Sequence, residues 1–130
     1  MLRTKMQDLE RARLRLKKKN LSLVIVKNGR IVFETESHGI KGFLEAIELL
    51  GKELAESSVA DRVVGRAVAF LCVYFQISAV FAVMISVEGV RVLEDNDVFY
   101  RFEKCVPNIL NQKRNGICPF EKLALTFATS

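Results

Sequence analysis

Residues 21–36 are LSLVIVKNGRIVFETE, and this stretch decides the class of fold. Two runs rich in β-branched and aromatic residues, 21–26 and 30–36, flank the pair Asn28-Gly29. Asn-Gly is a strong hairpin signal because both residues tolerate the positive φ values that a tight two-residue turn needs. The sequence therefore predicts an antiparallel hairpin near the start of the chain.

After the hairpin, helical and strand-like patterns alternate along the chain. The expected helices cover 41–56, 61–75 and 86–94, and the expected strands cover 77–85 and 98–104. A further helix is expected from Cys118 onward. A hairpin followed by such alternation favours the α/β class, as a three-layer α/β/α sandwich around a mixed sheet.

One uncharged stretch, residues 67–87, has the length of a membrane span. Gln76 and Ser78 interrupt its middle, and its aromatic residues lie inside the stretch instead of at its ends. We therefore expect a buried helix followed by a buried central strand, with no membrane partner.

The net charge of +5 over 130 residues comes from the N-terminal segment. Residues 1–19 carry a net +6, so the rest of the chain is close to neutral. We expect a basic N-terminal helix, 1–19, followed by a single α/β domain, 20–130. The helix packs a thin leucine stripe on the domain or on a partner subunit, which leaves a homodimer open. The alternative is attachment to nucleic acid through residues 1–19 alone, although without aromatic residues this segment offers no base stacking.

The cysteine and histidine content limits the chemistry. Cys72, Cys105 and Cys118 are odd in number and widely spaced, and the N-terminus is charged, which favours a reduced, cytoplasmic protein. His38 is the single histidine and there is no Cys-x-x-Cys pair, so neither a metal site nor a cofactor is expected. We interpret His38 as a turn residue, with a general base as the alternative.

The segment 61–67, DRVVGRA, is interpreted as a helix start that could bind an anion. Asp61 would cap the helix, and Gly65 would let another backbone or a ligand approach closely. Arg66 would hold a carboxylate or phosphate in a forked pair. The alternative is an ordinary capped helix with a surface arginine.

A second helix start is expected at Cys118-Pro119-Phe120-Glu121. Proline at the first helical position and an acidic residue in the first turn are typical of such starts. A thiol at the positive end of a helix is acidified, so Cys118 is the candidate nucleophile. The alternative is a small buried residue, as free cysteine usually is.

These two motifs, in this order and after the hairpin, resemble an uncharacterised prokaryotic family. That family is a domain of unknown function with the cytidine-deaminase-like fold. The resemblance covers residues 20–127 and leaves the basic N-terminal helix outside. It implies a mixed five-stranded sheet sandwiched by helices.

The resemblance does not imply deamination. Deaminases of this fold hold zinc with a His-x-Glu or Cys-x-Glu helix start and a Pro-Cys-x-x-Cys helix start, and neither motif is present here. The resemblance also directs attention to Asn111, although Gln112 stands where the family has arginine. The candidate ligand-binding residues are Asp61, Gly65, Arg66, Asn111 and Glu121.

Three functions remain open at this point. The first is a metal-free pocket protein or enzyme that binds a small anionic or nucleoside-like ligand, with Cys118 as nucleophile. The second is a non-catalytic ligand-sensing or assembly domain in which Cys118 is inert. The third is an RNA-associated module that binds through residues 1–19.

Overall fold

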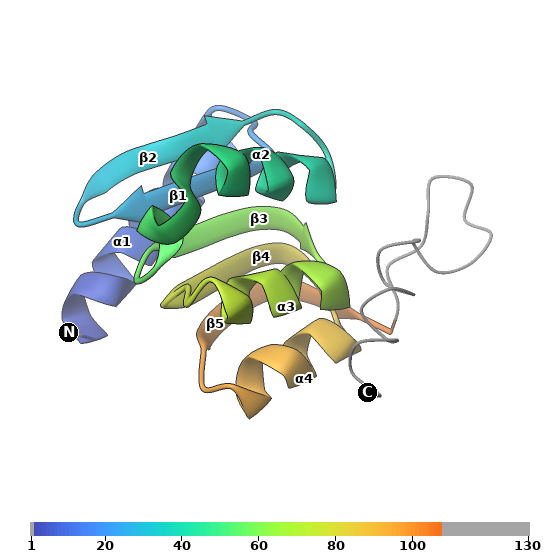
Figure 1. The fold of residues 1–130 in the computed structure, drawn as a ribbon. Coiled ribbons are helices and arrows are strands. Elements are labelled where there is room, and N and C mark those ends of the chain that lie inside the picture. Colours follow the sequence, from blue (N-terminus) through green and yellow to red (C-terminus); the bar gives the residue numbers. More distant parts are fainter. Residues whose placement is uncertain (1, 108–130) are drawn as a thin grey trace.

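The computed structural model describes residues 2–107, which form a mixed five-stranded sheet with helices on both faces (Figure 1). The helices are α1 (Leu2–Lys18), α2 (Ile40–Leu50), α3 (Arg66–Tyr74) and α4 (Val87–Asp95). The strands are β1 (Leu23–Lys27), β2 (Arg30–Thr35), β3 (Ser58–Val64), β4 (Ala79–Ser86) and β5 (Phe99–Val106). The expected α/β sandwich around a mixed five-stranded sheet is thus confirmed.

The strand order is β2-β1-β3-β4-β5. Strand β1 runs antiparallel to both β2 and β3, whereas β3, β4 and β5 are parallel to one another. The predicted hairpin turn is confirmed, because Asn28 and Gly29 have φ values of 52° and 78°. Ile25 pairs with Phe33 and the next residue of β1 pairs with Ile31, so Val32 is a bulge on β2.

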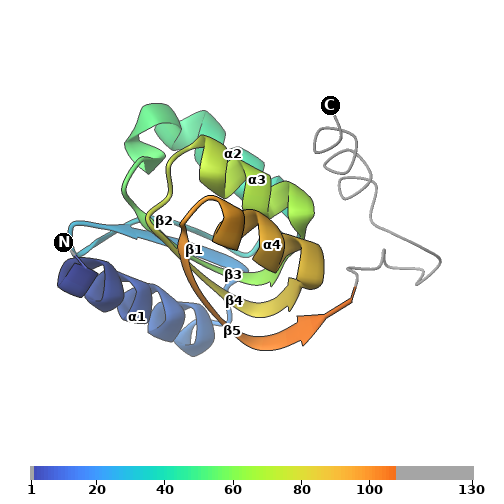
Figure 2. The same ribbon diagram turned by 90° about the horizontal axis from the view of Figure 1, so that it is seen from below.

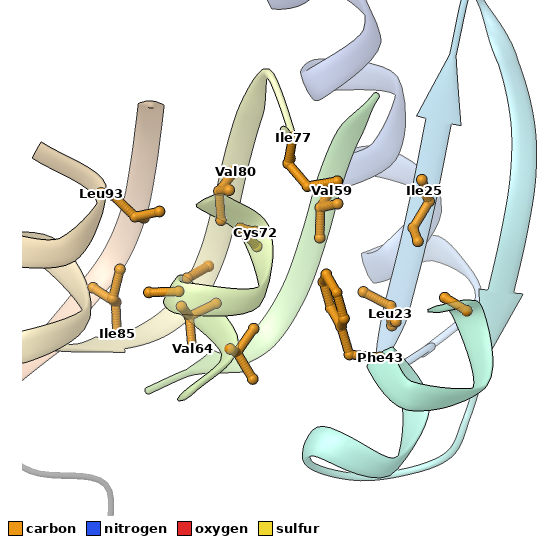
Figure 3. Close-up of a cluster of buried hydrophobic side chains, with 14 of the residues drawn as sticks. Leu23, Ile25, Phe43, Val59, Val64, Cys72, Ile77, Val80, Ile85 and Leu93 are labelled. Carbon is orange, nitrogen blue, oxygen red and sulfur yellow. The ribbon is translucent and has the colours of Figure 1, made fainter. Parts of the chain in front are cut away.

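The sheet separates two hydrophobic cores. Figure 2 shows α1 on one face and α2, α3 and α4 on the other. The larger core lies under α2, α3 and α4 and includes Phe43, Val59 and Val80 (Figure 3). The smaller core lies between α1 and the sheet and includes Leu16 and Ala60. Val59 and Ala60 are neighbours on β3, so consecutive side chains of this strand serve opposite faces.

Helix α1 is packed onto the sheet by apolar and polar contacts. Leu9, Ala12 and Leu16 are buried in the smaller core. The Asp8 carboxylate on α1 accepts the backbone N–H of Gly29 at 3.1 Å, which ties the helix to the hairpin turn.

The charged residues of α1 also contact the sheet. Arg15 pairs with Glu34 on β2 at 2.8 Å, and Lys17 pairs with Glu103 on β5. Part of the basic charge of this helix is therefore balanced by acidic residues of the sheet. The division of the chain at residue 19 stays a prediction.

The expected helix over 61–75 is wrong in its first turn, because residues 58–64 form strand β3 and the helix begins only at Arg66. Backbone partners explain the difference. Asp61 pairs with Leu23 of β1 and Ala82 of β4, so this segment fills the centre of the sheet. Its valines are β-branched and suit a strand buried on both faces.

Other boundaries follow the expected chemistry. The helix expected over 41–56 ends at Leu50, and Gly51, with φ 51°, begins a short 3₁₀ turn. Ser86 caps α4 as expected, because its hydroxyl accepts the N–H of Gly89 at 2.9 Å.

The uncharged stretch 67–87 is divided between α3 and β4. Among residues 2–107, no helix combines the length and the apolar character that a membrane crossing requires.

Candidate functional site

The carboxyl ends of the parallel strands β3 and β4 meet at one edge of the sheet. Helix α3 begins directly after β3, and α4 begins directly after β4 (Figure 1). Ligands of open α/β sheets bind in the crevice outside such strand ends, where backbone N–H groups of the helices point outward. We call this the α3/α4 edge, and Gly65, Arg66 and Glu88 form its described part.

Arg66 is the first residue of α3, and its side chain lies between the two helices. The side chain is 15% exposed, and its Nη1 donates to the carboxylate of Glu88 in the first turn of α4. Its guanidinium carbon lies 5.7 Å from the centre of the Phe70 ring, within the range of a cation–π contact. Arg91 approaches the same carboxylate at 3.6 Å but is 69% exposed. Arg66 is therefore a guanidinium fixed in orientation at the start of a helix.

Gly65 occupies the N-cap position of α3 in an extended conformation. Its carbonyl accepts the N–H of Ala69 at 3.0 Å, which is the first hydrogen bond of the helix. Glycine has no side chain with which to cap the N–H groups of the first turn. The backbone at this position thus offers donors of the kind that bind anions at helix N-termini.

Asp61 does not cap a helix, because it lies inside β3, where the residue is only 5% exposed. Burial raises the pKa of this carboxyl from 3.8 to about 7. The N–H of Val63 donates to its Oδ1 at 3.3 Å and opposes part of that rise. Asp61 is therefore a core carboxyl that exchanges a proton near neutral pH.

Cys72 of α3 belongs to the same core. Burial, with a smaller contribution from the charge of Asp61, raises the pKa of the Cys72 thiol far above its usual value, so it stays a thiol. Cys105 on β5 is exposed, so it does not pack in the core as Cys72 does. His38 is exposed in the turn before α2, with its Nδ1 3.4 Å from the hydroxyl of Ser22.

The remaining candidates, Cys118, Glu121 and Asn111, lie outside the described residues. Within residues 2–107, no cluster of three or more histidine, cysteine or acidic side chains could hold a metal ion. A hollow of about 220 Å³ lies on the opposite face, between α1 and the sheet, and its described lining includes Arg13, Phe99 and none of the candidates.

Sequence reasoning missed the two residues that contact Arg66, Glu88 and Phe70. The position of Glu88 in the first turn of a helix could have been predicted from the sequence, because acidic residues are common in the first turn after a serine cap such as Ser86. Its pairing with Arg66 is a long-range contact across two helices, which periodicity does not reveal.

The chain has the deaminase-like α/β fold. RibD of Acinetobacter baumannii superposes with a TM-score of 0.55 at 16% identity, over 99% of this chain and 39% of that one. The dCMP deaminase of the cyanophage S-TIM5, in its apo form, superposes with a TM-score of 0.52 at 14% identity, over 78% of this chain and 96% of that one. These identities show a shared fold alone.

The chain belongs to the family described as a domain of unknown function, DUF1893, whose model matches residues 11–129. A DUF1893 family protein from Thermotoga maritima has a crystal structure that is similar to this one. The two sequences are 30% identical, and the structures superpose with a TM-score of 0.81. The match covers 90% of this chain and 79% of the Thermotoga chain. The resemblance inferred from the motifs is confirmed, and the family match also takes in part of α1. No curated protein matches this sequence.

Proposed function

We propose that this protein binds a small anionic ligand at the α3/α4 edge, with Arg66 as the residue that holds the anion. The observation that carries the proposal is the placement of the Arg66 guanidinium between Glu88 and Phe70, at the carboxyl end of β3. A guanidinium held in one orientation loses little entropy when it binds a carboxylate or phosphate through two N–H groups.

The backbone supports the same ligand chemistry. Gly65 leaves the first turn of α3 without a side-chain cap, so its N–H groups can approach an anion closely. Glu88 orients the Arg66 guanidinium by accepting a hydrogen bond from it. The negative charge of Glu88 also lowers the affinity of Arg66 for a second anion, because the two negative charges repel each other. We therefore expect a ligand that carries its negative charge beside an uncharged, aromatic or sugar-like body.

The fold suggests a nucleoside monophosphate as the first ligand to test, since a solved relative of this fold is named as a dCMP deaminase. Binding and catalysis are separate questions here. The proposal concerns binding, and a nucleophilic Cys118 stays a prediction about a residue outside the described part of the chain.

The test is isothermal titration of the full-length protein with dCMP, cytidine and inorganic phosphate. Binding of dCMP and phosphate, but not cytidine, would show that the anion carries recognition. Arg66→Ala should abolish that binding, and Arg66→Lys should retain only part of it, because lysine keeps the charge but loses the fork. Circular dichroism establishes that each variant is folded at the temperature of the titration.

Arg91→Ala is the matched control, because Arg91 contacts the same Glu88 carboxylate but is 69% exposed. This variant should bind like the wild type. If none of the three compounds binds, or if Arg66→Ala binds as tightly as the wild type, the proposed function is wrong.

A further inference from the structure

The outer edge of β5 has the features of a strand that pairs with a second copy of itself. Strand β5 runs for eight residues, from Phe99 to Val106, and forms one end of the sheet (Figure 2). Within the described residues, its strand partner is β4 alone, so its other edge presents backbone donors and acceptors. Such an edge is a template for another strand.

The two ends of the sheet differ in a way that matters for pairing. Strand β2, at the opposite end, is shorter and carries the bulge at Val32, which disturbs its edge. Strand β5 keeps one constant register with β4 from Phe99 to Val106. A regular edge of this length is the better surface for adding a strand.

The side chains of β5 fit an antiparallel copy in one register. About a two-fold axis perpendicular to the sheet at Phe102, each Arg101 faces Glu103 of the other copy, and each Tyr100 faces Lys104. The two copies are then joined by two ion pairs and two cation–π contacts between their β5 side chains. Axes at Arg101 or Glu103 would instead place like charges opposite one another.

The aromatic residues support the same register. Tyr100 and Phe102 already stack, with ring centres 6.2 Å apart and ring planes 6° from parallel. Phe102 is 41% exposed, although it is a large apolar side chain. In the paired edge, Phe102 of each copy meets Phe102 of the other, and the two stacks join into one continuous aromatic row.

We propose that this protein forms a two-fold homodimer through antiparallel pairing of β5 with β5 of a second copy, centred on Phe102. Glu103 keeps its contact with Lys17 of α1 on the same face, so each new ion pair extends an existing one. The sheet then runs continuously through both subunits, as ten strands from the two described sheets. This inference does not depend on the proposed anion site, which lies on other elements.

The first test measures register directly. In a Cys105→Ser, Cys118→Ser background, Phe102→Cys should form an intermolecular disulfide rapidly under mild oxidation. Directly opposed residues have Cα atoms about 5 Å apart, within the range a disulfide spans. Lys104→Cys is the matched control, because two copies of residue 104 would be about 14 Å apart and should not cross-link.

The second test uses charge. Arg101→Glu and Glu103→Arg should each weaken dimerisation by about tenfold or more in analytical ultracentrifugation, because like charges then face each other. An equimolar mixture of the two variants should dimerise again, since the opposite charges face each other in the mixed pair. Circular dichroism of each variant alone checks that α1 and the sheet remain folded.

The outcomes separate the alternatives. A wild-type protein that stays monomeric up to the highest soluble concentration overturns the proposal, whether residues 108–130 or solvent cover the edge. A dimer in which Phe102→Cys fails to cross-link, or in which Lys104→Cys cross-links equally well, overturns the β5 register. Dimerisation with both the selective cross-link and the rescue by mixing supports it.

Discussion

Replacing Asp61 with asparagine should change how the stability of this protein depends on pH. The carboxyl of Asp61 is buried in the central strand β3, and burial raises its pKa from 3.8 to about 7. The unfolded chain exposes the same carboxyl to water, where it ionises near its ordinary value. Between about pH 4 and 7, the folded protein therefore holds a proton that the unfolded chain has released.

The sign of the effect follows from that difference in bound protons. Because unfolding releases a proton in this window, the free energy of unfolding falls as pH rises through it and levels off above the folded-state pKa. A rise of about three pKa units corresponds to about 4 kcal/mol lost between the two ends of the window. The asparagine side chain carries no ionisable proton, so Asp61→Asn should match the wild type in acid and exceed its stability above neutral pH by up to about 4 kcal/mol.

The assay is urea unfolding followed by circular dichroism for both proteins across the window from about pH 4 to 8. The informative quantity is the difference between their free energies of unfolding at each pH. Contributions from other groups cancel in that difference as long as the two proteins share the same ion pairs. Equal m-values would show that both proteins expose the same surface on unfolding.

Glu34→Gln provides a control of opposite sign. The Arg15 guanidinium lowers the pKa of Glu34, so this carboxylate stabilises the fold above its ordinary pKa and loses that contribution as pH falls. The pair is partly exposed, so its effect should be small. The difference between the free energies of unfolding of wild type and Asp61→Asn could instead stay constant within about 0.5 kcal/mol from about pH 4 to 8. In that case the buried carboxyl of Asp61 does not hold a proton in the folded protein, and the predicted pH dependence is wrong.

Three further predictions concern α1, α4 and the thiols. Leu16→Ala should lower the free energy of unfolding by about 3 kcal/mol in urea titrations, because Leu16 is fully buried under α1. Ser86→Ala should cost about 1 kcal/mol in the same assay through loss of the α4 cap, and Ser86→Thr should cost less. In alkylation followed by mass spectrometry, exposed Cys105 should react readily and buried Cys72 only on unfolding. A nucleophilic Cys118 should react faster than Cys105 at neutral pH, and a rate no faster would contradict that role.

Local chemistry predicted the parts of this fold in which one segment determines its own shape. The turn at Asn28 and Gly29 and the cap at Ser86 need only neighbouring residues, and both are confirmed. Strand β3 depends on partners distant in sequence. An aspartate ahead of valines and glycine matches a capped helix as well as a strand, and pairing with β1 and β4 selects the strand.

The candidate site shows the same limit. The sequence places Arg66 on a helix, because the helical pattern after it is a local signal, but it starts that helix at Asp61, whereas α3 begins at Arg66 itself. The sequence predicts Asp61 as a partner of Arg66 only if both residues belong to one helix. The strand instead turns the carboxyl into the core, where the pKa depends on burial that sequence alone does not report. The proposed anion site therefore depends on Arg66 and Gly65, without Asp61.

The packing of α1 changes how its basic charge has to be tested. Deleting residues 1–19 would remove Leu9 and Leu16 from the smaller core, so any loss of RNA affinity could reflect unfolding. Arg15 and Lys17 already pair with acidic residues of β2 and β5. The charges suited to an RNA contact are the exposed ones, such as Arg11 and Lys18. Reversing those two leaves the packed face intact, so a steep salt dependence that disappears in that variant would be a property of the surface and not of the fold.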